Sequence, residues 1–198
     1  GGGILQKAKK LLKRRQFNKV ITLLRPHVLN FNQSFQFFYI LGVACLYAGL
    51  VDEAEDYFTK ARRLSITDEN LQLAQAAIFV YHYENPNAID YCLSVLEKNP
   101  KNKHAKKMLN LIRDYGTAEN ISEWKLNGKI KKFYPPLGIN PKIYTIPLIL
   151  LLTIALVFAG ILALKNHNKI SNSRADLSAY ELTIDERLQA TEDKGIFR

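Results

Sequence analysis

Few residues in this sequence combine the types and the spacing that catalysis or metal binding requires. The two cysteines, Cys45 and Cys92, can form neither a disulfide framework nor a four-thiolate zinc site. The four histidines are scattered and lack the spacing of metal ligands. The sequence also contains no glycine-rich phosphate loop, no nucleophile elbow and no His-Glu-His zinc helix. It therefore predicts a non-enzymatic protein without a metal site or a cofactor.

Charged side chains gather at two places in the first half of the chain. Acidic residues at positions 52–56 open an expected helix, where negative charge complements the helix dipole. Basic residues are dense near the N-terminus, at Lys7, Lys9, Lys10, Lys13, Arg14, Arg15 and Lys19. We interpret these as a solvated helix face, because apolar Ala8, Leu11 and Leu12 lie between them. An acidic protein partner or an anionic membrane surface is the alternative, and nucleic acid is the least favoured partner.

The net charge of +10 is unevenly placed along the 198 residues. Residues 1–142 hold 22 basic and 12 acidic groups, whereas residues 165–198 hold six of each. Residues 143–164 contain no charged group at all. These differences divide the chain into a basic N-terminal part, an apolar segment and a neutral polar tail.

An internal repeat is the strongest pattern in the N-terminal part. Residues 35–68 match a 34-residue helix–turn–helix template at the positions that hold small, bulky and turn residues. These matching residues are Phe38, Leu41, Gly42, Gly49, Ala54, Phe58 and Ala61. Small residues allow two antiparallel helices to approach closely, Phe58 fills the space between neighbouring pairs, and Gly49 stands at the turn. The same frame extends without a gap into residues 1–34 and 69–102, although position 7 is polar in both flanking copies.

This set of residues resembles the tetratricopeptide repeat (TPR) family. The resemblance implies an all-α fold, in which three TPR helix–turn–helix units (1–34, 35–68 and 69–102) form a solenoid. Residues 103–115 form an amphipathic pattern that we expect to cap the solenoid's exposed core. A generic array of helical hairpins is the alternative.

In TPR arrays the first helix of each pair lines a concave groove. The corresponding candidate groove residues here are Leu5, Lys9, Lys13, Tyr39, Val43, Tyr47, Leu73, Ala77 and Tyr81. The recurring tyrosines at 47 and 81 favour protein binding, since tyrosine is enriched at interfaces. The carboxylate clamp of chaperone-binding TPR proteins is absent from the corresponding positions. We expect an apolar or amphipathic protein segment as partner, and core packing is the alternative role for part of this set.

Residues 116–142 interrupt the helical pattern with several glycines and prolines, and are predicted to be a juxtamembrane linker. Aromatic and basic residues here are typical of a membrane-interface belt, with a plain linker as the alternative. The candidate interface residues are Trp124, Lys131, Lys132, Phe133, Tyr134, Lys142 and Tyr144.

Residues 143–164 are predicted to be a single transmembrane helix, because 22 helical residues cross the roughly 30 Å hydrocarbon core of a bilayer. Ala155, Ala159, Gly160 and Ala163 form a small-residue stripe that would let two such helices pack, so a homo-oligomer is a further possibility. Five basic residues precede the span and three follow it, which favours a cytoplasmic repeat domain. The tail, 165–198, is expected to begin with a flexible exit at 166–174 and to continue as a short amphipathic helix or as disorder.

These features together predict a membrane-anchored TPR scaffold or adaptor that docks a partner protein and supports assembly of a membrane complex. One alternative is a permanent structural subunit of a large membrane machine. Lysine outnumbers arginine 19 to 9, which is typical of an AT-rich bacterial genome, so we expect the bacterial inner membrane. In that setting the chain is similar in organisation to the TPR proteins of the spirochaete flagellar-motor collar. Another alternative is the regulatory module of a longer enzyme that continues beyond Arg198.

Overall fold

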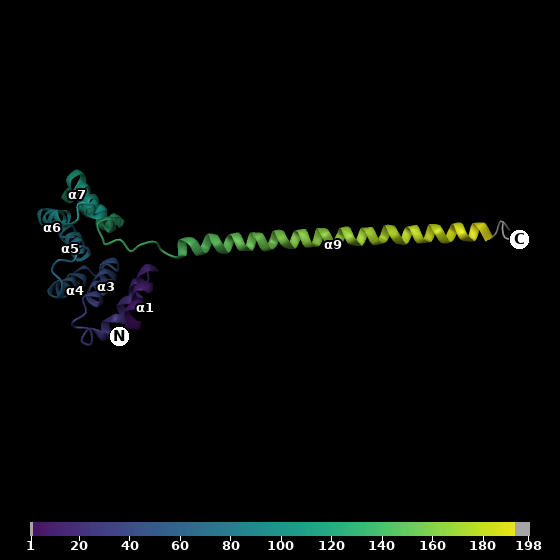
Figure 1. Ribbon diagram of the computed structural model, residues 1–198. Helices are drawn as coiled ribbons and strands as arrows, with labels where there is room; N and C mark the ends of the chain where they lie inside the picture. Colours follow the sequence, from purple (N-terminus) through teal and green to yellow (C-terminus); the bar gives the residue numbers. More distant parts are fainter. Residues whose placement is uncertain (1, 193–198) are drawn as a thin grey trace. The chain divides into compact units, whose positions relative to one another are not determined.

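The computed structural model describes residues 2–192, and every regular element in that range is a helix (Figure 1). The chain divides after Pro141 into two units, which are described separately below. The predicted all-α architecture of helical repeats, a following helix at the predicted cap and one long apolar helix is confirmed.

The first unit is built from three consecutive helical hairpins and the helices that follow them. The hairpins are α1 (Gly2–Lys13) with α2 (Phe17–Leu24), α3 (Phe35–Tyr47) with α4 (Val51–Leu64), and α5 (Glu69–Tyr81) with α6 (Asn85–Lys98). A 3₁₀ turn, η1 (Arg25–His27), extends α2, and α7 (Lys103–Tyr115) packs on α6 at the predicted cap position. Helices α3, α5 and α7 each have 13 residues and begin 34 residues apart, so the predicted spacing is present in the structure.

The helix starts recur because their capping residues recur. Ser34, Asp68 and Asn102 each precede a first helix, and each side chain accepts a hydrogen bond from the backbone N–H three residues later. Such caps satisfy one of the N–H groups that have no partner within the helix. The second helices α2, α4 and α6 have no side-chain cap.

Each hairpin turns at a residue in the left-handed backbone region, again at a spacing of 34. These residues are Arg15 (φ 60°), Gly49 (φ 85°) and Tyr83 (φ 65°). Glycine adopts this conformation freely, whereas arginine and tyrosine adopt it at a cost. The flanking repeats therefore keep the turn geometry of the middle repeat without its glycine.

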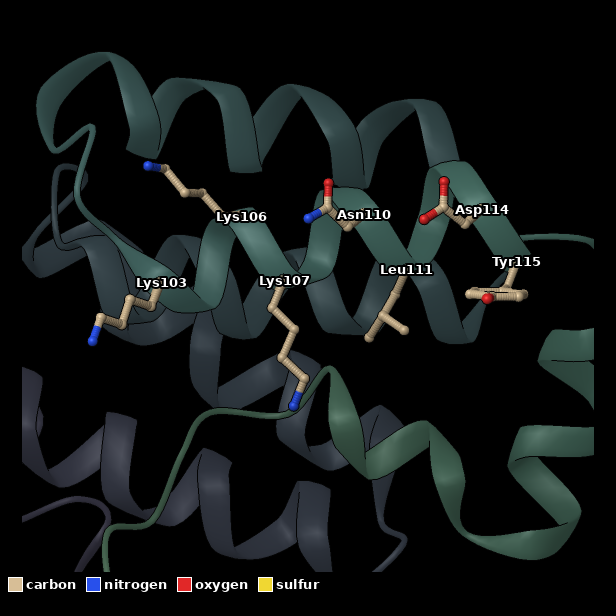
Figure 2. A pocket seen from close by; sticks show the side chains of 7 residues that line it. All are labelled: Lys103, Lys106, Lys107, Asn110, Leu111, Asp114 and Tyr115. Atoms are coloured by element: carbon tan, nitrogen blue, oxygen red, sulfur yellow. The ribbon is translucent and has the colours of Figure 1, made fainter.

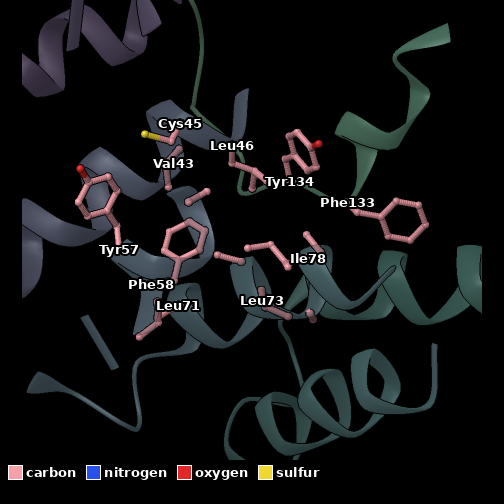
Figure 3. Close-up of a cluster of buried hydrophobic side chains, with 14 of the residues drawn as sticks. Val43, Cys45, Leu46, Tyr57, Phe58, Leu71, Leu73, Ile78, Phe133 and Tyr134 are labelled. Atoms are coloured by element: carbon pink, nitrogen blue, oxygen red, sulfur yellow. The ribbon is translucent and has the colours of Figure 1, made fainter. Parts of the chain in front are cut away.

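The core of the first unit is most tightly packed within the middle hairpin. Gly42 of α3 lies against the fully buried ring of Phe58 on α4, and a Cβ atom at position 42 would lie 2.6 Å from Phe58 Cε1. Ala54 and Ala61 on α4 are also fully buried. Figure 3 shows Phe58 within this cluster, near Val43 and Leu71. Small residues at these positions allow the two helices to approach, as the sequence predicts.

Asp68→Ala is expected to lower the free energy of unfolding by about 1 kcal/mol, because the Leu71 N–H loses its capping acceptor. Urea denaturation of the full chain, followed by the emission of Trp124, measures this loss. Gln16→Ala is the matched control, since Gln16 precedes α2 without capping it. Equal destabilisation by both substitutions would contradict the capping role.

The predicted linker, 116–142, is only partly irregular. It contains α8 (Ala118–Asn127) and the 3₁₀ turn η2 (Lys129–Lys132), so part of the predicted linker is helical. Thr117 caps α8 with its hydroxyl, and Gly128 ends it in the left-handed conformation (φ 78°). The glycines at 116 and 128 thus mark the boundaries of a short helix. Thr117 has φ −76°, so it does not adopt the left-handed conformation of the turn residues in the three hairpins. Helix α8 contacts α5 and η2.

The second unit begins with α9 (Lys142–Glu192), a continuous helix of 51 residues. Its segment Lys142–Lys169 has a mean hydropathy of 2.8 and is long and apolar enough to cross a membrane. Pro147 lies near the start of α9, where loss of its N–H disturbs few helical hydrogen bonds. The predicted flexible exit at 166–174 is wrong: the helix continues through it, since neither glycine nor proline occurs between Gly160 and Glu192. The small-residue stripe of the sequence analysis is exposed on α9, and its role in helix pairing stays a prediction.

Candidate partner-binding groove

The predicted groove residues lie on the side of the first unit formed by α1, α3, α5 and α7, called here the first-helix face. Val43, Leu73 and Ala77 are buried there and belong to the core, which was the alternative role for part of the set. The remaining predicted residues are partly buried or exposed, namely Leu5, Lys9, Lys13, Tyr39, Tyr47 and Tyr81. The face therefore offers less free apolar surface than the sequence predicts.

Residues 133–138, called here the crossing segment, lie across the first-helix face. At one end the carbonyl oxygen of Phe133 is 3.2 Å from Nε2 of His104 on α7. In the middle the Tyr47 hydroxyl on α3 donates a hydrogen bond of 2.8 Å to the Pro135 carbonyl. At the other end Arg15 Nη2 donates to the Gly138 carbonyl at 2.7 Å, and Nη1 donates to the Leu137 carbonyl at 3.4 Å. The segment thus runs from α7 past α3 to the turn between α1 and α2.

Aromatic rings fix the crossing segment to the face. The Tyr134 ring contacts the Tyr47 ring edge to face, with centroids 5.2 Å apart, and Tyr47 stacks on Phe17 at 5.0 Å. Phe133 packs against Trp124 of α8 at 5.5 Å. Figure 3 shows Phe133 and Tyr134 on the same cluster as Leu46, Leu73 and Ile78. A hollow of about 260 Å³ remains beside Pro135 and Pro136 on this face.

Burial of these rings corrects the predicted membrane-interface belt. Phe133 is 1% exposed and Tyr134 is 4% exposed, and Trp124 is partly buried against Phe133. Phe133 and Tyr134 are packed within the first unit, so they are not available to lipid, whereas the interface role of the partly buried Trp124 stays a prediction. Lys131, Lys132, Lys142 and Tyr144 are exposed, and their interface role stays a prediction.

Helix α8, which precedes the crossing segment, is attached to the turn between α5 and α6. The hydroxyls of Tyr83 and Ser122 are 2.8 Å apart, and Lys125 Nζ lies 3.9 Å from the centre of the Tyr83 ring and 4.1 Å from that of Tyr81. Hydrogen bonds from Ser122 and Lys125 lower the pKa of the Tyr83 hydroxyl. Arg15 and Tyr83 both adopt the left-handed backbone conformation that is unfavourable for residues other than glycine. The side chains of both therefore bind parts of the chain that follow α7. The 34-residue spacing from Gly49 identifies these turn positions in the sequence, but it does not indicate what they bind.

Burial shifts the pKa of several ionisable groups near the first-helix face. It raises the pKa of Tyr39, Tyr47 and Tyr134, so these hydroxyls remain protonated hydrogen-bonding groups. It also raises the pKa of the Cys45 thiol to about 11 and that of Cys92 to about 12. Both cysteines are fully buried and held as unreactive thiols, since the thiolate is the nucleophilic form.

Lowering the pH from about 7.5 to about 5.5 is expected to destabilise the first unit through His104. Burial lowers the pKa of His104, against an opposing contribution from the Phe133 carbonyl. The unfolded chain therefore binds a proton that the folded chain does not, so stability is present above the unfolded pKa and falls as the pH drops below it. Urea denaturation at each pH measures the slope.

His104→Gln is the control for this pH dependence, because glutamine can donate to the Phe133 carbonyl but does not titrate. It should reduce the loss of stability on acidification, while the other three histidines are unchanged. An identical slope in both proteins would remove His104 from the explanation.

The outer surface of α7 carries a second, shallow hollow of about 400 Å³. Figure 2 shows the side chains that line it, which project from one stretch of α7: Lys103, Lys106, Lys107, Asn110, Leu111, Asp114 and Tyr115. Tyr115 is 55% exposed, and the hollow combines apolar area with three lysines. It is open to solvent, whereas the crossing segment covers part of the first-helix face.

Among residues 3–169 and 187–189, whose side chains the structure describes, no three histidine, cysteine or acidic side chains are grouped so as to hold a metal ion. No model of a known protein family matches the sequence, and no curated protein is significantly similar to it.

Proposed function

We propose that this protein is a non-enzymatic, membrane-anchored scaffold of the TPR type that supports the assembly of a membrane complex. The observation that carries the proposal is the 34-residue recurrence of helix starts, N-caps and left-handed turns in the first unit. The same chain supplies a helix of sufficient length and hydropathy to span a bilayer. A repeat domain attached to such a helix raises the local concentration of any bound protein at the membrane.

The proposed orientation places the repeat unit on the cytoplasmic side of a bacterial inner membrane. Five basic residues lie within 18 positions before α9's apolar segment, and three follow it. Cytoplasmic flanks of membrane helices carry the excess of lysine and arginine. The polar C-terminal part of α9 would then emerge on the opposite side.

The crossing segment favours a permanent structural subunit over an exchangeable adaptor. An adaptor needs an open groove, whereas here the first-helix face holds Phe133 and Tyr134 at core-like burial. A fixed subunit can use other surfaces, and the open hollow on α7 is the one we propose for its neighbour. Lys103, Lys106 and Lys107 would complement an acidic patch with an apolar centre on that neighbour. A collar-like membrane machine of the spirochaete flagellar type is one setting in which such a subunit would act.

Site-specific photo-crosslinking in cells distinguishes these functions. A crosslinker at Tyr115, on the exposed surface of α7, is compared with one at Tyr47, beneath the crossing segment. The subunit function predicts one abundant intermolecular adduct from position 115 in fixed ratio to the protein, and none from 47. Intermolecular adducts from 47 would favour the adaptor. Absence of adducts from both positions in correctly folded, membrane-extracted protein would contradict the scaffold.

A further inference from the structure

The chain leaves the first unit beside its first hairpin turn. Arg15 in that turn holds the carbonyls of Leu137 and Gly138. Three residues then separate Gly138 from Lys142, where α9 begins. A fully extended chain across those four steps spans at most about 14 Å. The chain between Gly138 and α9 is therefore short.

Three exposed basic residues lie within four positions of Arg15 along the chain. They are Lys13 and Arg14 at the end of α1 and Lys19 in α2, called here the basic turn. Among the side chains that the structure describes (residues 3–169 and 187–189), no acidic group forms an ion pair with any of them. Their charges are thus not neutralised by the part of the protein that the structure describes.

A shallow hollow of about 360 Å³ lies next to the basic turn. It is lined by Arg15, Gln16, Phe17, Asn18, Lys19 and Ala48. It offers a cationic and partly apolar surface with enough room for a phosphate group. Lys98 and Lys101, by contrast, lie at the opposite ends of the hairpin helices, at the loop between α6 and α7. A 13-residue helix places the hairpin turn at one end about 20 Å from the loop between hairpins at its other end.

We propose that the basic turn docks on anionic phospholipid headgroups of the membrane that α9 crosses. The inference rests on the proposed membrane anchoring. The membrane end of α9 would lie at the bilayer surface, and at most about 14 Å of extended chain joins that end to Gly138, which Arg15 holds beside the first hairpin turn. Basic residues near an anionic surface are attracted within a Debye length of it. The crossing segment therefore sets the edge of the repeat unit that meets the lipid.

The test uses the full chain in nanodiscs that carry a headgroup-attached fluorescence quencher. Single-cysteine variants place a fluorophore at Asn18, in the basic turn, or at Asn32, in a loop between hairpins; both sites are exposed. The native Cys45 and Cys92 are buried and do not compete for the label. A third variant labelled at Val157, on α9, is read with an acyl-chain quencher and reports insertion on its own.

The proposal expects stronger quenching at 18 than at 32 in nanodiscs containing phosphatidylglycerol. The difference should shrink in pure phosphatidylcholine, and it should shrink when salt shortens the Debye length from about 10 Å to about 3 Å. Neutralising Lys13, Arg14 and Lys19 together to glutamine should lower the docked-to-undocked ratio about fivefold per charge removed. Lys98→Gln, Lys101→Gln and Lys106→Gln together are the matched control, with the same loss of charge and little effect.

Three results would overturn the proposal in distinguishable ways. Loss of acyl-chain quenching at 157 would refute membrane anchoring, and the lipid site with it. Normal quenching at 157 with equal quenching at 18 and 32 in anionic nanodiscs would refute the lipid site alone. A difference between 18 and 32 that is unchanged by lipid charge would also refute it, and would indicate tethering without headgroup binding.

Discussion

Gly42→Leu is expected to unfold the first unit or to lower its free energy of unfolding by about 3 kcal/mol or more. Even a Cβ atom at position 42 would lie 2.6 Å from Phe58 Cε1 and 2.7 Å from Cδ1. The Phe58 ring is fully buried, so it has no solvent-facing position to move into. A leucine adds three more carbon atoms at the same point, and the two helices of the middle hairpin must separate to accommodate it.

Urea titration of the full chain in detergent measures this effect with two signals. Far-UV circular dichroism reports the helices, and the emission of Trp124, the one tryptophan of the sequence, reports the packing of Phe133. Gly3→Leu is the matched control, because nothing lies within 4 Å of a Cβ atom built at position 3. An unchanged midpoint for Gly42→Leu would contradict the close approach of α3 and α4.

The repeat could be predicted because its determinants are local. The small residue Gly42 recurs as Ala8 and Ala76 in a frame of fixed length, and close helix approach restricts that position to small side chains. Capping residues at 34, 68 and 102 occur with the same period, and they are a further local signal of the helix starts in the sequence. Helix bounds within the three hairpins follow from these local rules.

The crossing segment could not be predicted, because its sequence fits two environments equally well. Tyrosine and phenylalanine beside lysines suit a membrane interface, and they also suit a protein face that buries rings while lysines stay in solvent. Only the tertiary structure brings Tyr47 and His104 to the carbonyls of a segment about 30 to 90 residues later in the chain. Arginine and tyrosine at turns 15 and 83 also obscured the turn signal that glycine gives at 49.

The long helix α9 illustrates a different limit. A polar composition at 166–174 favours neither helix nor coil strongly, whereas the absence of glycine and proline removes any reason for the helix to stop. The apolar segment itself was recognised without the structure, because 22 uncharged residues are sufficient evidence of a candidate span.

Tyr134→Ala is expected to release the crossing segment from the first-helix face while the hairpins remain folded. Removal of a buried aromatic ring costs about 3–5 kcal/mol. The segment is held mainly by the rings of Phe133 and Tyr134 and by a few hydrogen bonds at Tyr47, His104 and Arg15. These few contacts contribute a stabilising free energy of similar size to this loss. The crossing segment should therefore be released locally before the first unit unfolds globally.

Hydrogen exchange of the full chain, resolved by mass spectrometry, separates local release from global unfolding. In the wild type the N–H groups of Lys131, Phe133 and Tyr134 bond to carbonyls within residues 128–131, and these amides should exchange faster in the variant. Amides of α3 to α6 should keep their protection. Tyr144→Ala is the matched control, because Tyr144 lies beyond the first unit and is 61% exposed. Unchanged exchange at 129–138 in Tyr134→Ala would mean that the segment is held by other contacts. Equal acceleration throughout α3 to α6 would mean that it is an inseparable part of the core, which would exclude any partner that binds by displacing it.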